Sequence, residues 1–265
     1  MIVDGKAIAV DIYREVQNQI SHMETKPHLT VFTCAPNFET QKYLTLKSKK
    51  AHEVGIGITV IEFPKDITTE EVVTSITNAR MQTDGMIVQL PFPEHIDVDA
   101  VLEAVPLAYD VDAVHYNGSD HRILPPVVGA ISEIAKRNDI LFAAQKVTII
   151  GRGKLVGKPA EIWCQRQGAQ VKTFTKASGD ITEATKDAHI LILGAGHPYL
   201  VRPEMIAPKV VIFDAGTSED GGMLKGDADP ACAEKAALIT PVPGGIGPIT
   251  VAILLRNLVI ISSRQ

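Results

Sequence analysis

Strand patterns and helix patterns alternate along nearly all of this chain, and this alternation restricts the possible folds more than any other feature. Apolar residues recur at Ile8, Ile12, Val16 and Ile20, which is the spacing of one face of a helix. Further helices are predicted at residues 38–54, from Thr68 onward, at 127–137, at 159–167 and after Gly247. Strands are predicted at residues 29–34, 58–63, 85–90, 146–150, 169–174, 189–193, 209–213 and 237–239. Strands separated by helices pair in parallel and are covered on both faces, so we expect an α/β fold.

The bulk composition narrows the class of protein. Of the 265 residues, 45% are hydrophobic, which is enough for the cores of two domains, with a boundary between residues 114 and 126. The formal net charge is −5 without a block of like charge, so we expect no nucleic-acid partner. The three cysteines are far apart, which suggests neither a disulfide framework nor a metal site.

The apolar segments are too short to cross a bilayer. The longest run, residues 251–261, is interrupted by Arg256 and Asn257. The first residues lack the apolar core of a signal peptide. We therefore expect a cytoplasmic protein with no membrane partner.

A glycine-rich turn follows the predicted strand at 146–150. Gly151, Gly153 and Gly157 stand between that strand and the helix at 159–167. Glycines at such a turn let the backbone approach a pyrophosphate at the helix N-terminus. The spacing GxGxxxG is one residue longer than the usual dinucleotide fingerprint, and many such matches are plain turns. The strand before it and the helix after it favour a Rossmann-type nucleotide-binding domain.

The end of the next strand bears on the choice of cofactor. NAD sites usually place an acidic residue there for the ribose 2′-hydroxyl. Here Lys172 and Lys176 occupy this region, the next carboxylate is Asp180, and Arg152 stands in the glycine turn. Cations in place of an acid favour a 2′-phosphate and hence NADP, although such lysines are more often solvated surface residues.

A small set of polar residues could carry chemistry in the first half of the chain. Tyr43 and Lys47 share one face of a predicted helix, where a buried lysine could serve in acid–base catalysis. Gln89 is the polar residue of an otherwise apolar predicted strand, near its carboxyl end. Asp110 and Asp112 follow a short predicted helix, and a turn-capping role is equally consistent with them.

Prolines and glycines are concentrated at residues 241–248, directly before an apolar helix. Proline fixes φ while glycine permits close backbone approach, so the mixture is typical of a shaped loop. On composition alone an ordinary strand-to-helix turn would be the simpler interpretation.

Taken together, these motifs resemble the FolD family of bifunctional methylenetetrahydrofolate dehydrogenase/methenyltetrahydrofolate cyclohydrolases over nearly the whole chain. The landmarks are residues 4–6 (DGK), Tyr43 with Lys47 and Lys49, 84–91 (DGMIVQLP), 110–112 (DVD), 151–159 (GRGKLVGKP), 226–227 (GD) and 240–250 (TPVPGGIGPIT). The last of these is the most specific.

The resemblance implies two α/β domains flanking a cleft, the second a Rossmann-type parallel sheet with helices on both faces. The implied limits are residues 1–118 plus 246–265 for the folate-binding domain and 119–245 for the NAD(P)-binding domain. The final helix would pack on the first domain, and the protein would be a homodimer formed through the nucleotide domain.

The resemblance also implies the reaction and its residues. A tetrahydrofolate derivative, 5,10-methylenetetrahydrofolate, would be oxidised with NADP, with NAD as the alternative, and the product hydrolysed to 10-formyltetrahydrofolate in one-carbon metabolism and purine biosynthesis. The implied catalytic residues are Lys47, Tyr43, Gln89 and Asp112. The implied substrate-binding residues are Tyr43, Gln89, Leu90, Pro91, Asp112, Pro243, Gly244, Gly245 and Pro248. The implied cofactor-binding residues are Gly151, Arg152, Gly153, Val156, Gly157, Lys176, Gly194, Gly196, Gly216 and Gly245.

Four departures from the family pattern lie on the linker and cofactor side. Ala113 and Gly153 replace a glycine and a serine, Thr175 and Lys176 replace a His-Ser pair, and residues 115–129 form a shortened segment without the family's Cys-Thr pair. Two alternatives therefore remain: a cyclohydrolase with weak or NAD-dependent dehydrogenase activity, and a non-catalytic folate-binding homologue. A Rossmann oxidoreductase for another substrate is disfavoured, because the first domain also matches.

Overall fold

The computed structural model describes residues 1–119, 122–220 and 223–263, which form two compact units. Unit 1 comprises Met1–Val10, Tyr116–His121 and Pro125–Thr250, and unit 2 comprises Asp11–His115, Arg122–Leu124 and Val251–Gln265. The predicted domain limits fall near two of these junctions. The first ten residues, predicted to belong to the folate-binding domain, lie in unit 1 instead.

Unit 2 is built on a parallel three-stranded sheet with the order β2-β1-β3. Its strands are β1 (His28–Cys34), β2 (Gly57–Phe63) and β3 (Gly85–Val88), and its helices are α2 (Phe38–Val54), α3 (Thr69–Asn78) and the short α4 (Val98–Glu103), which precedes Asp110 as predicted. Local sequence fixes the helix ends. Asn37 accepts a bond from the backbone N–H of Thr40 at the start of α2, and Gly55 ends that helix with φ 90°. Thr68 and Glu71 form the capping box of α3.

The two faces of this sheet have different neighbours. Phe32, Met86 and Val88 point into a buried cluster with residues of α3 and α4. On the other face, a Cβ at Gly85 would collide with Val111 and Leu258. Leu258 belongs to α8 (Ile246–Ser262), so the prediction that the final helix packs on this part of the chain is confirmed.

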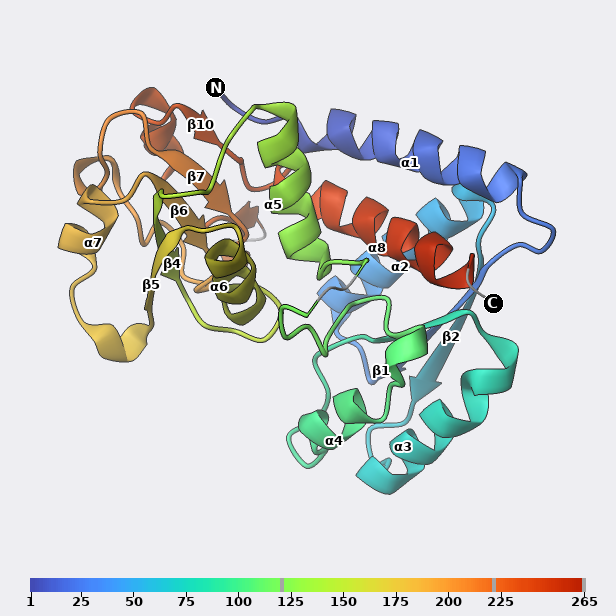
Figure 1. The fold of residues 1–265 in the computed structure, drawn as a ribbon. Helices are drawn as coiled ribbons and strands as arrows, with labels where there is room; N and C mark the ends of the chain where they lie inside the picture. The colour runs from blue at the N-terminus through green and yellow to red at the C-terminus, as the bar shows by residue number, and fades with distance from the viewer. Residues whose placement is uncertain (120–121, 221–222, 264–265) are drawn as a thin grey trace. The chain divides into compact units, whose positions relative to one another are not determined.

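Unit 1 contains a parallel five-stranded sheet with the order β10-β7-β6-β4-β5 (Figure 1). Its strands are β4 (Lys146–Ile150), β5 (Gln170–Phe174), β6 (Ile190–Leu193), β7 (Val211–Asp214) and β10 (Leu238–Ile239). The helices are α5 (Pro126–Arg137), α6 (Gly157–Arg166) and α7 (Thr182–Lys186). The chain adds β5 on one side of β4 and β6 on the other, so the strand order reverses between β4 and β6. Such a reversal is the usual nucleotide position in open α/β sheets.

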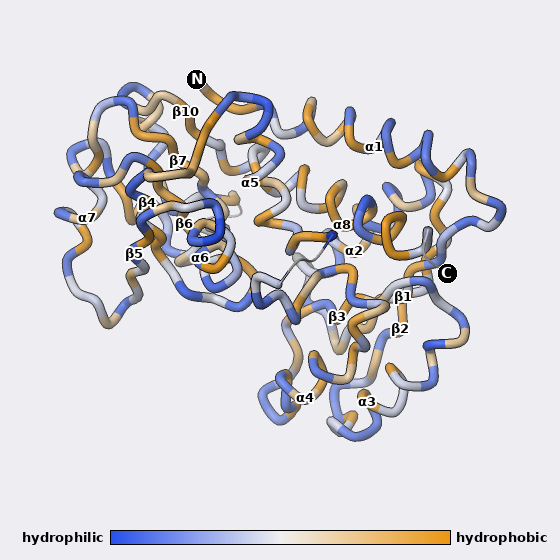
Figure 2. Tube along the Cα trace, in the orientation of Figure 1, coloured by the Kyte–Doolittle hydropathy of each residue, from blue (hydrophilic) through white to orange (hydrophobic). Residues whose placement is uncertain are grey.

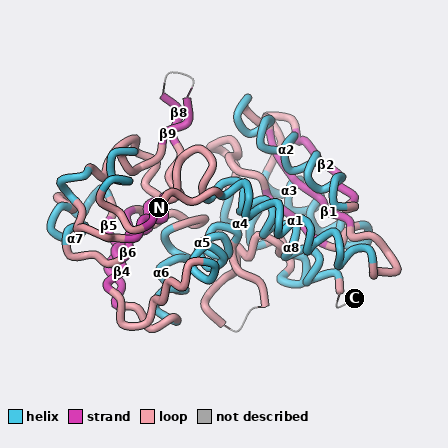
Figure 3. Tube along the Cα trace, turned by 90° about the horizontal axis from the view of Figure 1, so that it is seen from above, coloured by secondary structure: helices cyan, strands magenta, loops and turns pink. Residues whose placement is uncertain are grey.

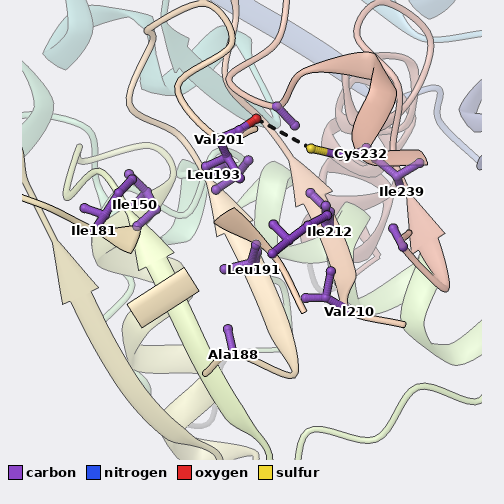
Figure 4. Packing of buried hydrophobic residues seen from close by; sticks show 13 residues of the cluster. Ile150, Ile181, Ala188, Leu191, Leu193, Val201, Val210, Ile212, Cys232 and Ile239 are labelled. Carbon is purple, nitrogen blue, oxygen red and sulfur yellow. Dashed lines mark hydrogen bonds between the residues drawn. The ribbon is translucent and has the colours of Figure 1, made fainter. Parts of the chain in front are cut away.

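Both faces of the five-stranded sheet are covered, as predicted. On one face Ile150, Leu191 and Ile212 belong to the buried cluster drawn in Figure 4, which also contains Cys232. On the other face Phe142 contacts the rings of Trp163 and Phe213. Figure 3 shows an antiparallel hairpin, β8 (Ser218–Asp220) and β9 (Met223–Lys225), extending away from this sheet. The sequence patterns predicted neither this hairpin nor α7.

The N-terminal segment joins unit 1 through β10. Ile2 forms a parallel bridge with Ile239, and the backbone N–H of Gly5 donates to the carbonyl of Gly244 over 3.0 Å. This pairing explains why the first ten residues belong to unit 1. Residues 1–4 precede α1 (Gly5–Ser21), along which hydrophobic and hydrophilic residues alternate (Figure 2). Among the helices of the described residues, none is long and apolar enough to cross a membrane.

Candidate active site

Lys47 is buried on α2 and contacts two of the other predicted catalytic residues. Only 5% of Lys47 is exposed, and its Nζ donates to Oε1 of Gln89 over 2.8 Å. The same Nζ lies 4.9 Å from the centre of the Tyr43 ring. The structure therefore brings Tyr43, Lys47 and Gln89 together within unit 2.

The position of Gln89 follows from the sheet. Gln89 is the first residue after β3, and its backbone N–H donates to the carbonyl of Phe32 in β1. Its side-chain Nε2 donates to the carbonyl of Leu90 over 3.0 Å, which turns Oε1 toward Lys47. Pro91, which follows Leu90, is exposed and is joined to it by a cis peptide.

Burial shifts the pKa values of two ionisable groups at this site. Desolvation lowers the pKa of Lys47, and the nearby Asp112 opposes that shift. Burial also raises the pKa of the Asp112 carboxyl to about 6, against the effect of Lys47. An amine that loses its proton more readily than an exposed lysine is better suited to act as a base.

The two predicted carboxylates have different surroundings. Asp110 accepts backbone N–H bonds from Val114 and His115, at 3.1 and 3.2 Å, so the turn-capping interpretation applies to it. Asp112 is the carboxylate coupled electrostatically to Lys47. Ala113, which replaces a family glycine, follows Asp112 and has φ 50°, a conformation that favours glycine.

Thr33 is a buried polar residue that the sequence patterns did not single out. In the register of β1 and β3, Phe32 pairs with Val88, so Thr33 lies beside Gln89 on the same sheet face. Its hydroxyl makes no hydrogen bond within the described part of the chain. The alternation of side chains along β1 could have identified it, because Thr33 interrupts an otherwise apolar face.

In unit 1, several predicted cofactor residues interlock at the carboxyl edge of the sheet. A Cβ at Gly151 would collide with the backbone of Gly194, and a Cβ at Gly157 would collide with the backbone of Gly151. A Cβ at Gly194 would strike the side chain of Val156. The three glycines leave no room for a side chain, because the turns after β4 and β6 pack against each other.

Gly153, Arg152 and Lys176 lie at the same carboxyl edge of the five-stranded sheet, but they are less tightly packed than the glycines above. Nothing lies within 4 Å of a Cβ built on Gly153 among the described residues, so this position is open. Arg152 makes a 3.0 Å ion pair from Nε to Glu161. Lys176 is exposed in the turn directly after β5. An open turn flanked by two cations, leading into a helix whose cap is the apolar Val156, fits a dinucleotide carrying an extra phosphate.

Lys172 does not belong to this group. It lies in the middle of β5, opposite Thr148. The pKa of Asp187, the residue that follows α7, is lowered mainly by its hydrogen bond from Lys146, to which the charge of Lys172 adds. The position of Lys172 favours a 2′-phosphate site less than that of Lys176, because Lys172 does not stand at the carboxyl end of the strand.

The remaining predicted residues lie in the loops of unit 1 and in or beside residues 241–248, called here the Pro/Gly segment. Gly245 is buried, its N–H donates to the carbonyl of Pro241, and its own carbonyl fills the space of a Cβ on Gly5. Helix α8 starts at Ile246, so Pro248 stands in its first turn, where proline is tolerated. Pro243 and Gly244 lie in the turn before it, Gly196 is exposed after β6, and Gly216 is buried after β7. In the shortened segment at 115–129, Asp120 and His121 lie outside the described residues.

Comparisons with known proteins agree with this geometry. Residues 3–112 match the family model described as tetrahydrofolate dehydrogenase/cyclohydrolase, catalytic domain. Residues 125–265 match the model of the NAD(P)-binding domain of the same family. The shortened segment overlaps the gap between these two matches.

Individual relatives cover almost the full chain. The bifunctional protein FolD of Nitrosospira multiformis is 35% identical over 98% of this chain and 94% of its own length. The crystal structure of the bifunctional enzyme FolD from Campylobacter jejuni has a TM-score of 0.96 at 29% identity, covering 100% of this chain and 99% of that one. The Trypanosoma brucei FolD, complexed with NADP cofactor and inhibitor, has a TM-score of 0.93 at 28% identity, covering 100% and 97%.

Proposed function

The chain belongs to the tetrahydrofolate dehydrogenase/cyclohydrolase family, and on that premise we propose how its residues carry the two activities. The enzyme oxidises 5,10-methylenetetrahydrofolate to 5,10-methenyltetrahydrofolate and hydrolyses that product to 10-formyltetrahydrofolate. The observation that carries the assignment of residues is the hydrogen bond from the buried Lys47 to Gln89.

Lys47 is the proton-transfer residue of the cyclohydrolase step. Its amine, neutral more readily because of burial, accepts a proton as water attacks the cationic methenyl carbon. When the bond from this carbon to N5 breaks, N5 takes the proton that Lys47 holds, the new hydroxyl releases its proton to water as it becomes the carbonyl, and the formyl group stays on N10. Gln89 orients the amine, the Tyr43 ring stacks on the folate, and Asp112 anchors the pterin.

The dehydrogenase step uses NADP. A bound nicotinamide supplies the hydride acceptor, and the protein orients the donor carbon and excludes water. Arg152 and Lys176 hold the 2′-phosphate, while the open backbone at Gly153 admits the pyrophosphate. Support for NADP over NAD comes from these cations and from the NADP complex of the Trypanosoma brucei relative.

Other parts of the proposal rest on the family resemblance. They are the assignment of Leu90, Pro91, Pro243, Gly244, Gly245 and Pro248 to the substrate side, and of Gly196, Gly216 and Gly245 to the cofactor. They also include the domain limits given above, apart from the first ten residues, which lie in unit 1, and further a homodimer, a cytoplasmic location and a role in purine biosynthesis.

Replacement of Lys47 by methionine tests the first assignment. K47M keeps the length and apolar stem of the side chain but removes the amine, so cyclohydrolase kcat should fall about 10²–10⁴-fold. Folate binding, measured by isothermal titration calorimetry, should persist. K50M is the matched control, because Lys50 lies on the same helix but pairs with Glu53 at 2.7 Å. Full cyclohydrolase activity in K47M would overturn the role of Lys47.

A dehydrogenase assay with NADP and with NAD tests the second assignment, the preference for NADP. The wild type should reduce NADP at lower KM than NAD, and K176A should raise the KM for NADP about tenfold with little effect on NAD. K172A is the control, since Lys172 lies in mid-strand. Equal KM values for both cofactors in the wild type would contradict the preference for NADP, and an unchanged KM in K176A would remove Lys176 from the phosphate site.

A further inference from the structure

Two carboxylates are buried in unit 1 beneath the loops at the carboxyl edge of the five-stranded sheet. Asp214 is the last residue of β7 and is 2% exposed. Asp227 follows the β8–β9 hairpin and is fully buried. Burying two acids side by side is costly unless their oxygens are well bonded, so their partners indicate their role.

Asp227 binds the loop that follows β6. Its Oδ2 accepts the backbone N–H groups of Ala195 and Gly196, at 2.6 and 3.3 Å. Its Oδ1 accepts the N–H of His197 at 2.7 Å. One carboxylate therefore fixes three consecutive backbone groups, in a loop where Gly196 restricts the backbone less than another residue would.

Asp214 and Gly216 connect this arrangement to the loop after β7. Oδ1 of Asp214 accepts from the N–H groups of Gly216 and Asp227, at 3.0 and 3.2 Å. Oδ2 accepts from Ala228 at 2.8 Å. Gly216 lies so close to Asp227 that a Cβ would collide with its carboxylate. The packing of Gly216 is thus explained by Asp227.

The pair also reaches the Pro/Gly segment. The backbone N–H of Asp214 donates to the hydroxyl of Thr240 over 2.7 Å, and Thr240 directly precedes Pro241. Burial, with a contribution from the charge of Asp227, raises the pKa of Asp214 to about 7. Near neutral pH the pair therefore need not carry two full charges.

We propose that Asp227, supported by Asp214, is a positioning residue that holds the loops after β6 and β7 in the shape required to bind the nicotinamide dinucleotide. Neither residue needs to touch the cofactor. Nucleotides bind beyond the carboxyl ends of the strands, where both loops lie, and a fixed loop loses less conformational freedom on binding than a mobile one. The inference rests on the proposed NAD(P)-binding function of unit 1.

Substitution of Asp227 tests the inference by direct NADP binding, measured by calorimetry on the full-length protein. D227N keeps one acceptor oxygen for Ala195 and Gly196 but turns an amide donor toward the N–H of His197. It should weaken NADP binding about tenfold. G216A, which pushes on the same carboxylate without changing a charge, should weaken binding in the same direction.

The matched control is D229N. Asp229 is partly exposed and accepts one N–H bond from Ala231, at 2.8 Å, so its substitution should leave the Kd for NADP within twofold. Cyclohydrolase activity, assigned to residues of unit 2, should also stay within twofold in D227N, which separates loop positioning from general loss of the fold.

The outcomes distinguish the inference from the function on which it rests. Failure of the wild type to bind NADP or NAD would refute the proposed cofactor. Wild-type binding with an unchanged Kd in both D227N and G216A would overturn the positioning role. Parallel loss of NADP binding and cyclohydrolase activity in both variants would show that Asp227 only maintains the fold, and would equally overturn it.

Discussion

Gln89 sets the protonation of Lys47 in the proposed mechanism, and its replacement by methionine should move the pH dependence of the cyclohydrolase reaction. Methionine has a similar length but offers no comparable acceptor for Nζ, which in the wild type donates to Oε1 at 2.8 Å. The ammonium form of Lys47 loses more from this change than the neutral amine does. The pKa of Lys47, already lowered by burial, should therefore fall further.

The size of the shift follows from hydrogen-bond energies. A bond from a charged donor contributes about 1.5–3 kcal/mol and one from a neutral donor about 0.5–1.5 kcal/mol. The difference, about 1–1.5 kcal/mol, corresponds to roughly one pKa unit. Because the step needs the deprotonated amine, activity rises with pH through this pKa. The rising limb in Q89M should lie about one unit below that of the wild type.

The assay is the pH dependence of cyclohydrolase kcat in both proteins at saturating methenyltetrahydrofolate, corrected for the spontaneous hydrolysis at each pH. Q41M is the control, because Gln41 is an exposed residue at the start of the same helix. Its rising limb should coincide with that of the wild type.

A limb that stays in place in Q89M, or moves to higher pH, would refute the coupling between Gln89 and the protonation of Lys47. A lower maximal rate without a shift would assign Gln89 to substrate orientation alone.

Three further predictions concern stability. Because the folded pKa of Asp112 is about 6 and its ordinary value 3.8, this carboxyl makes folding less favourable as pH rises between these values. The wild type should lose about 2 kcal/mol relative to D112N between pH 4 and pH 6 in urea titrations; parallel curves would contradict this. T33V removes a buried hydroxyl without a partner among the described residues and should stabilise the protein by about 1 kcal/mol, as should T173V, whereas only T33V should change cyclohydrolase kinetics if its hydroxyl serves the site. G157A should cost about 3 kcal/mol or more in thermal denaturation because its Cβ meets backbone, while G153A should stay within about 0.5 kcal/mol; similar losses in both would refute the packing role of Gly157.

The elements and the family could be predicted from the sequence because both depend on short-range information. Helix α2 has the predicted limits, since an Asn cap, an apolar periodicity and Gly55 all lie within it or at its ends. Tyr43 and Lys47 share a face because helix geometry places residues four apart together. Short motifs such as the glycine turn and the Pro/Gly segment likewise preserve their order along the chain.

The tertiary structure decided which residues meet and what their surroundings do to them. Lys47 and Gln89 are 42 positions apart, and only the packing of α2 against the sheet brings them to 2.8 Å and buries the amine. The N-terminus reaches the carbonyl of Ala237 across 236 positions, which assigned the first residues to unit 1. The landmark at residues 226–227 did not indicate what Asp227 binds, because its partners lie some 30 residues earlier in the chain. Periodicity and turn chemistry act over one or two turns of chain, whereas desolvation and long-range hydrogen bonds exist only after distant segments have packed.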